Sequence, residues 1–209
     1  MTRVKKLDYT PYVASIYTKL RDKETQQDEF VKYTDKLVHL LLMEAMNNLP
    51  TNGKTVDTPT GDQFEGLYLT NNICAVSILR AGDSMLPALR EVLDVPVGKI
   101  LIQRDEETIQ PKLFYSKLPP NMNQYNVWLL DPMVGTGGSA NTAIGILKEK
   151  GVKCITFISI LSCPEGLESI VKEHPDVSII TGYVDPGMNN KFYLSPGIGD
   201  FGDRYFGTT

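Results

Sequence analysis

Residues 127–142 have the sequence Val127-Trp-Leu-Leu-Asp131-Pro-Met-Val-Gly135-Thr-Gly-Gly-Ser139-Ala-Asn-Thr142. An apolar run ends at Asp131, and a glycine-rich turn leads into a helix expected to begin at about Ser139. Glycines let backbone N–H groups approach an anion without a Cβ in the way, and Thr136 and Ser139 add hydroxyl donors. The start of a helix also favours negative charge. The pattern predicts a phosphate-binding loop at the carboxyl end of a strand, where open α/β sheets place ligands.

Three kinds of phosphate loop and a plain structural turn are the candidates for this stretch. A Walker loop is excluded because no lysine occurs between Asp131 and Lys148. Gly135-x-Gly137-x-x-Ala140 fits a loose dinucleotide fingerprint, but the next apolar run ends in Leu161-Ser162-Cys163 and lacks the acidic residue that would bind a ribose hydroxyl. The third kind binds the 5′-phosphate of phosphoribosyl diphosphate (PRPP), with the strand-end aspartate facing the ribose hydroxyls. That loop and the structural turn both remain open at this point.

Short apolar runs alternate with helical stretches on both sides of the loop. Strands are expected at residues 73–79, 98–102, 127–130, 154–161 and 177–184. Helices are expected at residues 84–93, 139–150 and 164–173. Ser84 is expected to cap the first of these, which would place Pro87 in its first turn. Short strands without polar alternation, separated by helices, are typical of an α/β fold with a buried parallel sheet flanked by helices.

The chain is expected to form one domain over residues 1–209. No repeat or long linker interrupts it, and 209 residues can bury a sizeable core. Residues 1–50 are expected to be helical, and residues 51–72 to form turns with a short hairpin. Residues 103–126 contain no helical pattern and are expected to form an extended arm or lid. Its apolar edge, available for closure or for dimer packing, is Leu113, Phe114 and Tyr115.

The composition is that of an ordinary globular protein, with 42% hydrophobic and 22% charged residues. A net charge of −4 indicates no overall attraction to nucleic acid or membrane. No stretch approaches the ~20 apolar residues that span a bilayer, and no apolar run follows the basic N-terminus as in a signal peptide. Cys74 and Cys154 lie in apolar runs and are expected to be buried, reduced thiols. A cytoplasmic location is therefore expected.

Five segments, in order, resemble the uracil phosphoribosyltransferase family. The stretch from Asp131 to Ser139 resembles the family's PRPP loop, which typically reads Asp-Pro-Met-Leu-Ala-Thr-Gly-Gly-Ser. Here Val134-Gly135 replaces Leu-Ala, which should soften the loop by roughly 0.5–1 kcal/mol and leave its donors in place. The other four segments are Ile78-Leu-Arg-Ala-Gly82, Gln103-Arg-Asp-Glu-Glu-Thr108, Pro164-Glu-Gly166 and Pro196-Gly-Ile-Gly-Asp-Phe-Gly-Asp-Arg-Tyr-Phe-Gly-Thr208. The resemblance covers about residues 10–209, and residues 99–118 are similar to eukaryotic-type members.

The resemblance implies transfer of the phosphoribosyl group of PRPP to uracil, giving UMP and pyrophosphate in pyrimidine salvage. Positive charge develops on the sugar and negative charge on the leaving diphosphate, so the site needs cations, a carboxylate near the ribose and a slot for the base. By resemblance, the catalytic residues are Asp131, Arg104 and Asp200. The PRPP-binding residues are Arg80, Arg104, Asp131, Pro132, Met133, Val134, Gly135, Thr136, Gly137, Gly138, Ser139 and Asp200.

In this family the C-terminal segment carries the uracil slot, and we call residues 185–209 the hood. A glycine-dense backbone can offer main-chain N–H and C=O groups in the plane of a flat base. Cytosine replaces one acceptor of uracil with a donor, and such a mismatch can reduce the rate by roughly 10⁴-fold. By resemblance, the uracil contacts are Met133, Gly135, Leu194, Gly199, Asp200 and Phe201.

The resemblance also bears on cofactors and partners. Many PRPP enzymes have two acidic residues at the end of this strand, but Pro132 follows Asp131, so Mg²⁺ is expected to be held mainly by PRPP and no protein metal ligand is expected. A homodimer or homotetramer is implied, and some members respond to GTP. Neither nucleic acid nor a membrane is expected as a partner.

Other interpretations remain open. Arg80 could be a solvated strand-end arginine, and Arg104 could pair with an acid among residues 105–107. His39 and His174 have no visible catalytic partner and are interpreted as structural. The chain could be a non-catalytic pyrimidine-nucleotide or PRPP sensor on the same fold, or a phosphoribosyltransferase for another base. The complete set of Arg80, Arg104, Asp131 and Asp200 favours catalysis, and the glycine-dense C-terminus favours uracil.

Overall fold

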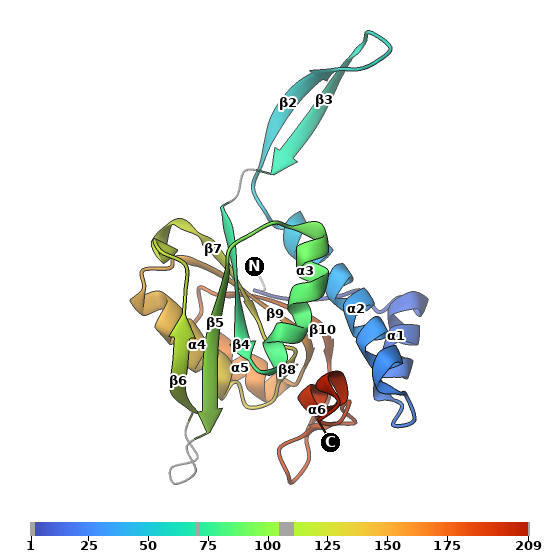
Figure 1. Cartoon of the computed structure of the whole chain (residues 1–209), viewed down its shortest axis with the longest axis vertical. Helices are drawn as coiled ribbons and strands as arrows, with labels where there is room; N and C mark the ends of the chain where they lie inside the picture. Colours follow the sequence, from blue (N-terminus) through green and yellow to red (C-terminus); the bar gives the residue numbers. More distant parts are fainter. Residues whose placement is uncertain (1–2, 70–71, 105–110, 209) are drawn as a thin grey trace.

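The computed structural model describes residues 3–69, 72–104 and 111–208, and its centre is one mostly parallel sheet (Figure 1). In spatial order its strands are β1 (Val4–Lys6), β10 (Ser178–Val184), β9 (Cys154–Ser162), β7 (Asn126–Leu130), β4 (Ile73–Leu79), β5 (Val97–Arg104) and β6 (Pro111–Lys117). The short strand β8 (Met133–Val134) pairs with the end of β9. Only the β5–β6 pair of this sheet is antiparallel among the described strands. The α/β fold expected from the sequence is confirmed.

The strand order reverses next to β4. The chain runs from β4 outward to β5 on one side, then returns to place β7 on the other side of β4. In an open parallel sheet the loops leaving the carboxyl ends of two such strands diverge and leave a crevice between them. Arg80 follows β4 and Asp131 follows β7, so both predicted site residues lie at this crevice.

Helices cover both faces of the sheet, which explains why its strands lack polar alternation. One face packs against α1 (Pro11–Arg21), α2 (Gln27–Asn47), α3 (Leu86–Val92) and α6 (Phe201–Phe206). The other face packs against α4 (Gly138–Glu149) and α5 (Pro164–Glu173). In β7 the side chains of Trp128 and Leu130 enter the first core, whereas those of Val127 and Leu129 enter the second.

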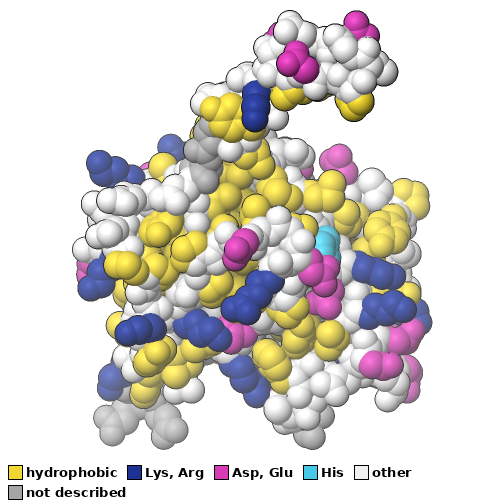
Figure 2. Space-filling model, turned by 45° about the horizontal axis from the view of Figure 1, so that its top comes forward, with side chains coloured by type: hydrophobic (Ala, Val, Ile, Leu, Met, Phe, Trp, Pro, Cys, Tyr) yellow, Lys and Arg dark blue, Asp and Glu magenta, His cyan; other side chains and the backbone are white. Residues whose placement is uncertain are grey.

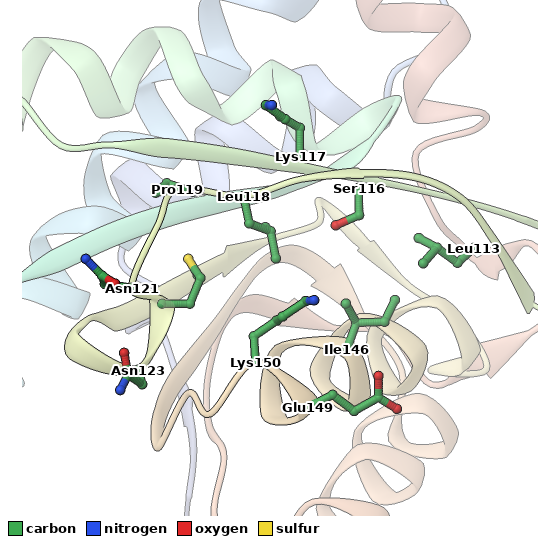
Figure 3. A pocket seen from close by; sticks show the side chains of 11 residues that line it. Leu113, Ser116, Lys117, Leu118, Pro119, Asn121, Asn123, Ile146, Glu149 and Lys150 are labelled. Atoms are coloured by element: carbon green, nitrogen blue, oxygen red, sulfur yellow. The ribbon is translucent and has the colours of Figure 1, made fainter.

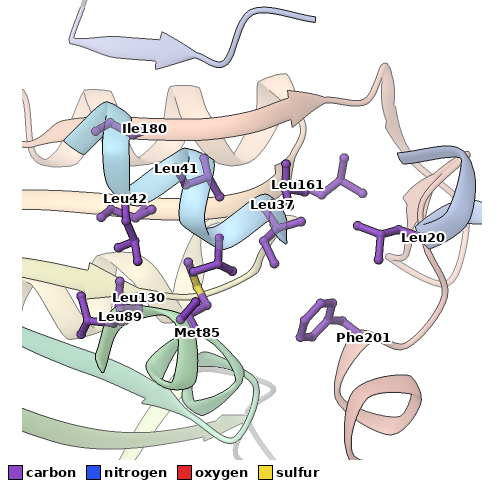
Figure 4. Close-up of a cluster of buried hydrophobic side chains, with 14 of the residues drawn as sticks. Leu20, Leu37, Leu41, Leu42, Met85, Leu89, Leu130, Leu161, Ile180 and Phe201 are labelled. Atoms are coloured by element: carbon purple, nitrogen blue, oxygen red, sulfur yellow. The ribbon is translucent and has the colours of Figure 1, made fainter. Parts of the chain in front are cut away.

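The first core depends on α2. Its buried residues recur every three or four positions, so they share one side of the helix. Figure 4 shows Leu37, Leu41 and Leu42 from this helix above Leu130 of β7, with Phe201 of α6 nearby. The helix thus joins the N-terminal region to the sheet and to the hood.

Several elements differ from the sequence-based expectation. Ser84 does not cap the helix, because the 3₁₀ helix η1 (Ala81–Met85) comes first and Met85 occupies the cap position of α3; Pro87 does fall in the first turn. The short strand β1 escaped notice because three residues carry no readable pattern. Part of the expected arm, β6, is an edge strand of the sheet, and the short 3₁₀ helix η2 (Met122–Gln124) follows it; residues 105–110 lie outside the described ranges.

The cysteine prediction was half right. Cys74 is buried, but Cys154 is exposed because it is the first residue of β9, where the strand enters the sheet. Cys163, at the other end of that strand, is buried. No helix in the described part of the chain is long and apolar enough to cross a bilayer.

Residues 51–69 form a longer hairpin than expected. Strands β2 (Thr51–Asp57) and β3 (Gln63–Leu69) pair over their whole length and stand away from the body (Figure 1). Nearly all of their side chains are exposed, including the apolar Val56, Phe64 and Leu67. Hydrophobic side chains also gather on the face of the body below the hairpin (Figure 2).

A buried ion pair attaches the hood to α1. Asp185 is fully buried, and its two carboxylate oxygens accept hydrogen bonds from Arg21 at 2.6 and 3.2 Å. The same carboxylate accepts from the backbone N–H of Gly197 at 2.8 Å, and Arg21 donates to the Gly197 carbonyl at 2.9 Å. The guanidinium also lies over the rings of Tyr17 and Tyr183.

Replacing Arg21 by alanine should destabilise the protein by about 3 kcal/mol or more, because it leaves the buried Asp185 carboxylate without its cation. Lys19→Ala, on the same helix, removes only an exposed pair with Glu29 and should cost about 1 kcal/mol or less. Urea unfolding of both variants measures the difference. Equal losses would contradict the anchoring role of the Arg21 pair.

Candidate active site

The loop after β7 is fixed along the end of β9. The Pro132 carbonyl accepts hydrogen bonds from the backbone N–H groups of Ile160 and Leu161 at 3.0 and 2.9 Å. The next two residues, Met133 and Val134, form the short strand β8, which pairs in parallel with the end of β9. Gly137 then has a φ of +81° and is the N-cap of α4, a backbone conformation that favours glycine.

The start of α5 packs directly against this loop. A Cβ at Gly166 would lie 2.2 Å from the Gly135 carbonyl oxygen, and one at Gly137 would lie 2.9 Å from the Gly166 carbonyl oxygen. The thiol of Cys163 also donates to the Gly135 carbonyl at 3.3 Å. The segment Pro164-Glu-Gly166 therefore supports the loop from behind, a role that its sequence did not reveal.

The loop encloses a cavity of about 180 Å³ at the N-terminus of α4. Its walls consist mainly of loop residues with small side chains, so main-chain groups form much of the surface. The lining residues are Asp131, Met133, Val134, Gly135, Thr136, Gly137, Gly138, Ser139, Ala140 and Phe192. A helix N-terminus with glycine backbone and two hydroxyls suits a phosphate group. Every predicted loop residue except Pro132 lines this cavity.

Asp131 has an unusual electrostatic environment. Burial raises the pKa of its carboxyl to about 7, although a hydrogen bond from the Met133 backbone N–H offsets part of this effect. The carboxylate form is therefore costly until a hydrogen-bond donor or a positive charge arrives. Ribose hydroxyls and a developing positive charge on a sugar are groups of that kind.

A second cavity of about 250 Å³ adjoins the first and lies under the hood. Both cavities are lined by Met133, Gly135 and Phe192. The other lining residues of the second are Ala81, Tyr193, Leu194, Gly199, Asp200, Phe201 and Gly202. The structure thus brings together all six residues expected to contact uracil, from two segments about sixty positions apart. We call this cavity the base slot.

Four lining residues of the base slot were missed: Ala81, Phe192, Tyr193 and Gly202. Phe192 and Tyr193 are 63% and 47% exposed in the structure. The readable signal in the sequence was two adjacent aromatic residues just before a glycine-dense segment. The Asn189 side chain accepts from the backbone N–H groups of Lys191 and Tyr193 at 2.9 and 3.1 Å. In this turn Phe192 has a φ of +62°. Phe192 lines both cavities, whereas Tyr193 lines the base slot.

The predicted charged residues have different surroundings. Asp200 is the N-cap of α6 and accepts from the Asp203 backbone N–H at 3.0 Å. Arg80 is half-exposed and is bound to Asp203 and Thr208 of the C-terminal segment. Arg104 is the last residue of β5, but its side chain, like residues 105–107, lies outside the described part.

Both histidines make contacts of an ordinary structural kind. His39 on α2 contacts the Asp35 carbonyl and the Glu91 carboxylate, and His174 is buried against the Asn141 carbonyl. Within residues 3–69, 72–104 and 111–208, no group of three or more His, Cys, Asp and Glu side chains is placed to hold a metal ion.

A larger cavity, about 590 Å³, lies elsewhere (Figure 3). Lys117 and Leu118 line it from the end of β6, and Glu149 and Lys150 from the end of α4. Lys117 pairs with Lys99 near the start of β5, so this cavity lies at the opposite end of the sheet from the loop. None of the predicted site residues contributes to it.

The sequence matches one protein-family model over nearly its whole length. The model of the family described as "Uracil phosphoribosyltransferase" matches residues 7–208. The chain belongs to the uracil phosphoribosyltransferase family. It is 45% identical over 196 residues to the uracil phosphoribosyltransferase of Dictyostelium discoideum, covering 92% of this chain and 91% of that protein. It is 46% identical over 203 residues to that of Saccharomyces cerevisiae, with 96% and 94% covered.

Solved structures agree on the fold. A protein from Aquifex aeolicus is 31% identical with a TM-score of 0.87, and 99% of each chain is covered. The adenine phosphoribosyltransferase of Trypanosoma brucei is only 10% identical to this chain and has a TM-score of 0.62. The match covers 92% of this chain and 87% of the Trypanosoma brucei chain. At that identity the likeness concerns the fold alone.

The raised pKa of Asp131 has a measurable effect on stability. The pKa of Asp131 is about 7 in the folded state and 3.8 in the unfolded state, so the folded state holds the proton more tightly. The folded protein therefore loses stability as the pH rises from 3.8 to about 7. Asp131→Asn should therefore stabilise the ligand-free protein more at pH 8 than at pH 5, in urea unfolding at both values.

Asp176 is the matched control, because its hydrogen bond to Lys148 lowers its pKa. The ionised Asp176 stabilises the protein at pH values above its unfolded pKa, and this effect is lost as the pH falls through its folded pKa. Asp176→Asn should therefore not increase the free energy of unfolding at pH 8. A gain from Asp131→Asn that does not depend on pH would contradict the raised pKa.

Proposed function

We propose that this chain is a uracil phosphoribosyltransferase, which joins uracil to PRPP and gives UMP and pyrophosphate. The observation that supports this most strongly is the junction of the two cavities at Met133 and Gly135. A nucleotide seated with its 5′-phosphate on the loop and its base in the slot would have its sugar at that junction. Asp131 lines the loop cavity, as a ribose-binding carboxylate requires.

The residues have distinct proposed roles in the transfer. The loop from Met133 to Ser139 binds the 5′-phosphate through backbone N–H groups and hydroxyls. Asp131 accepts hydrogen bonds from the ribose hydroxyls and stabilises the positive charge that develops on the sugar. Arg80 and Arg104 bind the leaving diphosphate, for which a guanidinium fork suits two oxygens at once.

The base slot selects uracil by the pattern of its polar groups. Gly199, Asp200, Phe201, Leu194 and Met133 all line the slot. In the proposed complex the first three would offer main-chain groups to the edge of the base, and Leu194 and Met133 would provide apolar walls. A cytosine ring in the same place would leave polar groups unpaired. The exposed rings of Phe192 and Tyr193 would limit access of water to the activated sugar.

The proposal includes Mg²⁺ bound mainly through PRPP. Asp131 is followed by proline, and it is the one carboxylate that lines the loop cavity in the described part of the chain. That donor set fits an ion that keeps its waters and takes most of its ligands from substrate oxygens. When bound, the ion would neutralise negative charge on the diphosphate. A GTP effector and a cytoplasmic location stay predictions, to be checked by activity assays with GTP and by cell fractionation.

The first experiment is an assay with radiolabelled uracil, PRPP and Mg²⁺ that measures UMP and pyrophosphate, with cytosine and hypoxanthine alongside. UMP from uracil alone is the expected result. Binding of PRPP or UMP with no product from any base would instead support a sensor, and product from hypoxanthine would support a purine enzyme.

Asp131→Asn is the matched inactive variant for that assay. It should lower kcat by about a hundredfold or more, because it removes a charge directed at the transition state, while the protein stays folded. Turnover at the wild-type rate would remove the proposed role of Asp131.

We also propose a homodimer in which the hairpin of residues 51–69 contacts a second copy. An isolated two-stranded hairpin is marginally stable in water, and this one exposes Val56, Phe64 and Leu67. Light scattering after size exclusion should report twice the chain mass. The double variant Phe64→Lys/Leu67→Lys should shift the mass toward that of a monomer, and an unchanged dimer would exclude the hairpin as the contact.

A further inference from the structure

The side chain of Arg80 is held by the end of the chain. Its Nη2 donates to Oδ1 of Asp203 at 2.8 Å, and its Nη1 donates to Oγ1 of Thr208 at 3.0 Å. The Thr208 hydroxyl in turn donates to the same Asp203 oxygen at 2.6 Å. The three side chains form a closed set of hydrogen bonds that joins the turn after β4 to helix α6 and to Thr208 just beyond it.

Two further contacts limit where the guanidinium can lie. A Cβ at Gly202 would be only 3.1 Å from Nη2 of Arg80, so the absence of a side chain there makes room for the group. On another side the ring of Phe206 lies 5.6 Å from the guanidinium carbon. The pKa of Asp203 is lowered by its hydrogen bonds from Thr208 and Arg80, so its carboxylate is ionised at neutral pH.

This set of contacts borders the base slot. Two residues next to Arg80 line that slot: Ala81, which follows it in the sequence, and Gly202, whose lack of a side chain makes room for the guanidinium. Arg80 is the first residue after β4 and lies at the crevice where the strand order reverses. A guanidinium has five N–H donors, and the contacts with Asp203 and Thr208 use two of them, so others remain for an anion at the crevice.

We infer that Asp203 and Thr208 are positioning residues, which hold Arg80 in one orientation for the diphosphate of PRPP. The inference rests on the proposed function and on the role of Arg80 in it. A half-exposed arginine loses rotamer freedom when it binds an anion, and these contacts remove that freedom beforehand. The Asp203 side chain is 34% exposed, so solvent partly screens its charge from an anion on the far side of the guanidinium. Loss of the positioning should weaken PRPP binding by about three- to tenfold.

The experiment compares Asp203→Ala, Thr208→Val and Thr208→Ser with the wild type. Thr18→Val is the matched control, because Thr18 is an exposed threonine on α1 whose hydroxyl binds the Ala14 carbonyl. For each protein the KM for PRPP, the KM for uracil and kcat are measured, with pyrophosphate affinity by calorimetry and the melting temperature. Asp203→Ala and Thr208→Val should raise the KM for PRPP and weaken pyrophosphate binding by about three- to tenfold, with the KM for uracil within about twofold. Thr208→Ser should recover most of what Thr208→Val loses.

Combination with Arg80→Ala separates the positioning role of Asp203 and Thr208 from the role of Arg80 itself in binding the diphosphate. If Asp203 acts through Arg80, Arg80→Ala/Asp203→Ala should bind pyrophosphate no more weakly than Arg80→Ala alone. An unchanged KM for PRPP in Thr208→Val and Asp203→Ala, or equal rises in both KM values, would overturn the positioning role. Unchanged PRPP handling in Arg80→Ala would overturn the role of Arg80 itself.

Discussion

The buried carboxylate of Asp185 is the constraint on which the site depends. It has no exposed surface, so its charge is tolerable only with the bidentate contact from Arg21 and the N–H of Gly197. That requirement fixes the position of the hood relative to the end of α1. Arg204 adds a second attachment, because its guanidinium donates to the carbonyls of Leu20, Asp22 and Ile198 and lies over the ring of Phe30. The N-terminal helices therefore determine where the base slot can form, although none of their residues lines it.

The loop side of the site follows from the sheet. Reversal of strand order opens the crevice, and close packing of glycine backbone then shapes it. A Cβ at Gly82 would lie 2.4 Å from the Leu130 carbonyl oxygen, so the turn after β4 can approach the end of β7 only without a side chain. This approach brings the Arg80 segment and Asp131 to the same edge.

Gly135 affects both halves of the site. From the sequence, its replacement of the more usual alanine predicted only a softer loop. In the structure a Cβ at this position would lie 3.0 Å from the sulfur of Met188, within the hood. A side chain at position 135 would therefore require the end of the Met188 side chain to shift by a few tenths of an ångström. Because Gly135 lines both cavities, the same choice affects the width of the passage between them.

Local patterns in the sequence were sufficient for much of the fold. The strand at residues 73–79 and the helix at 164–173 were predicted with their observed bounds, since apolar runs and proline or glycine boundaries are local signals. The phosphate loop was readable for the same reason, because it is a continuous segment whose glycines are needed by their own backbone. The contacts of Arg21 with Asp185 and of Arg80 with Asp203 join residues more than a hundred positions apart and leave no pattern along the chain. Burial of Cys163, exposure of Cys154 and the meeting of loop and hood at Met133 and Gly135 were likewise decided by the tertiary structure. They depend on which segments pack together, and only the folded chain determines that.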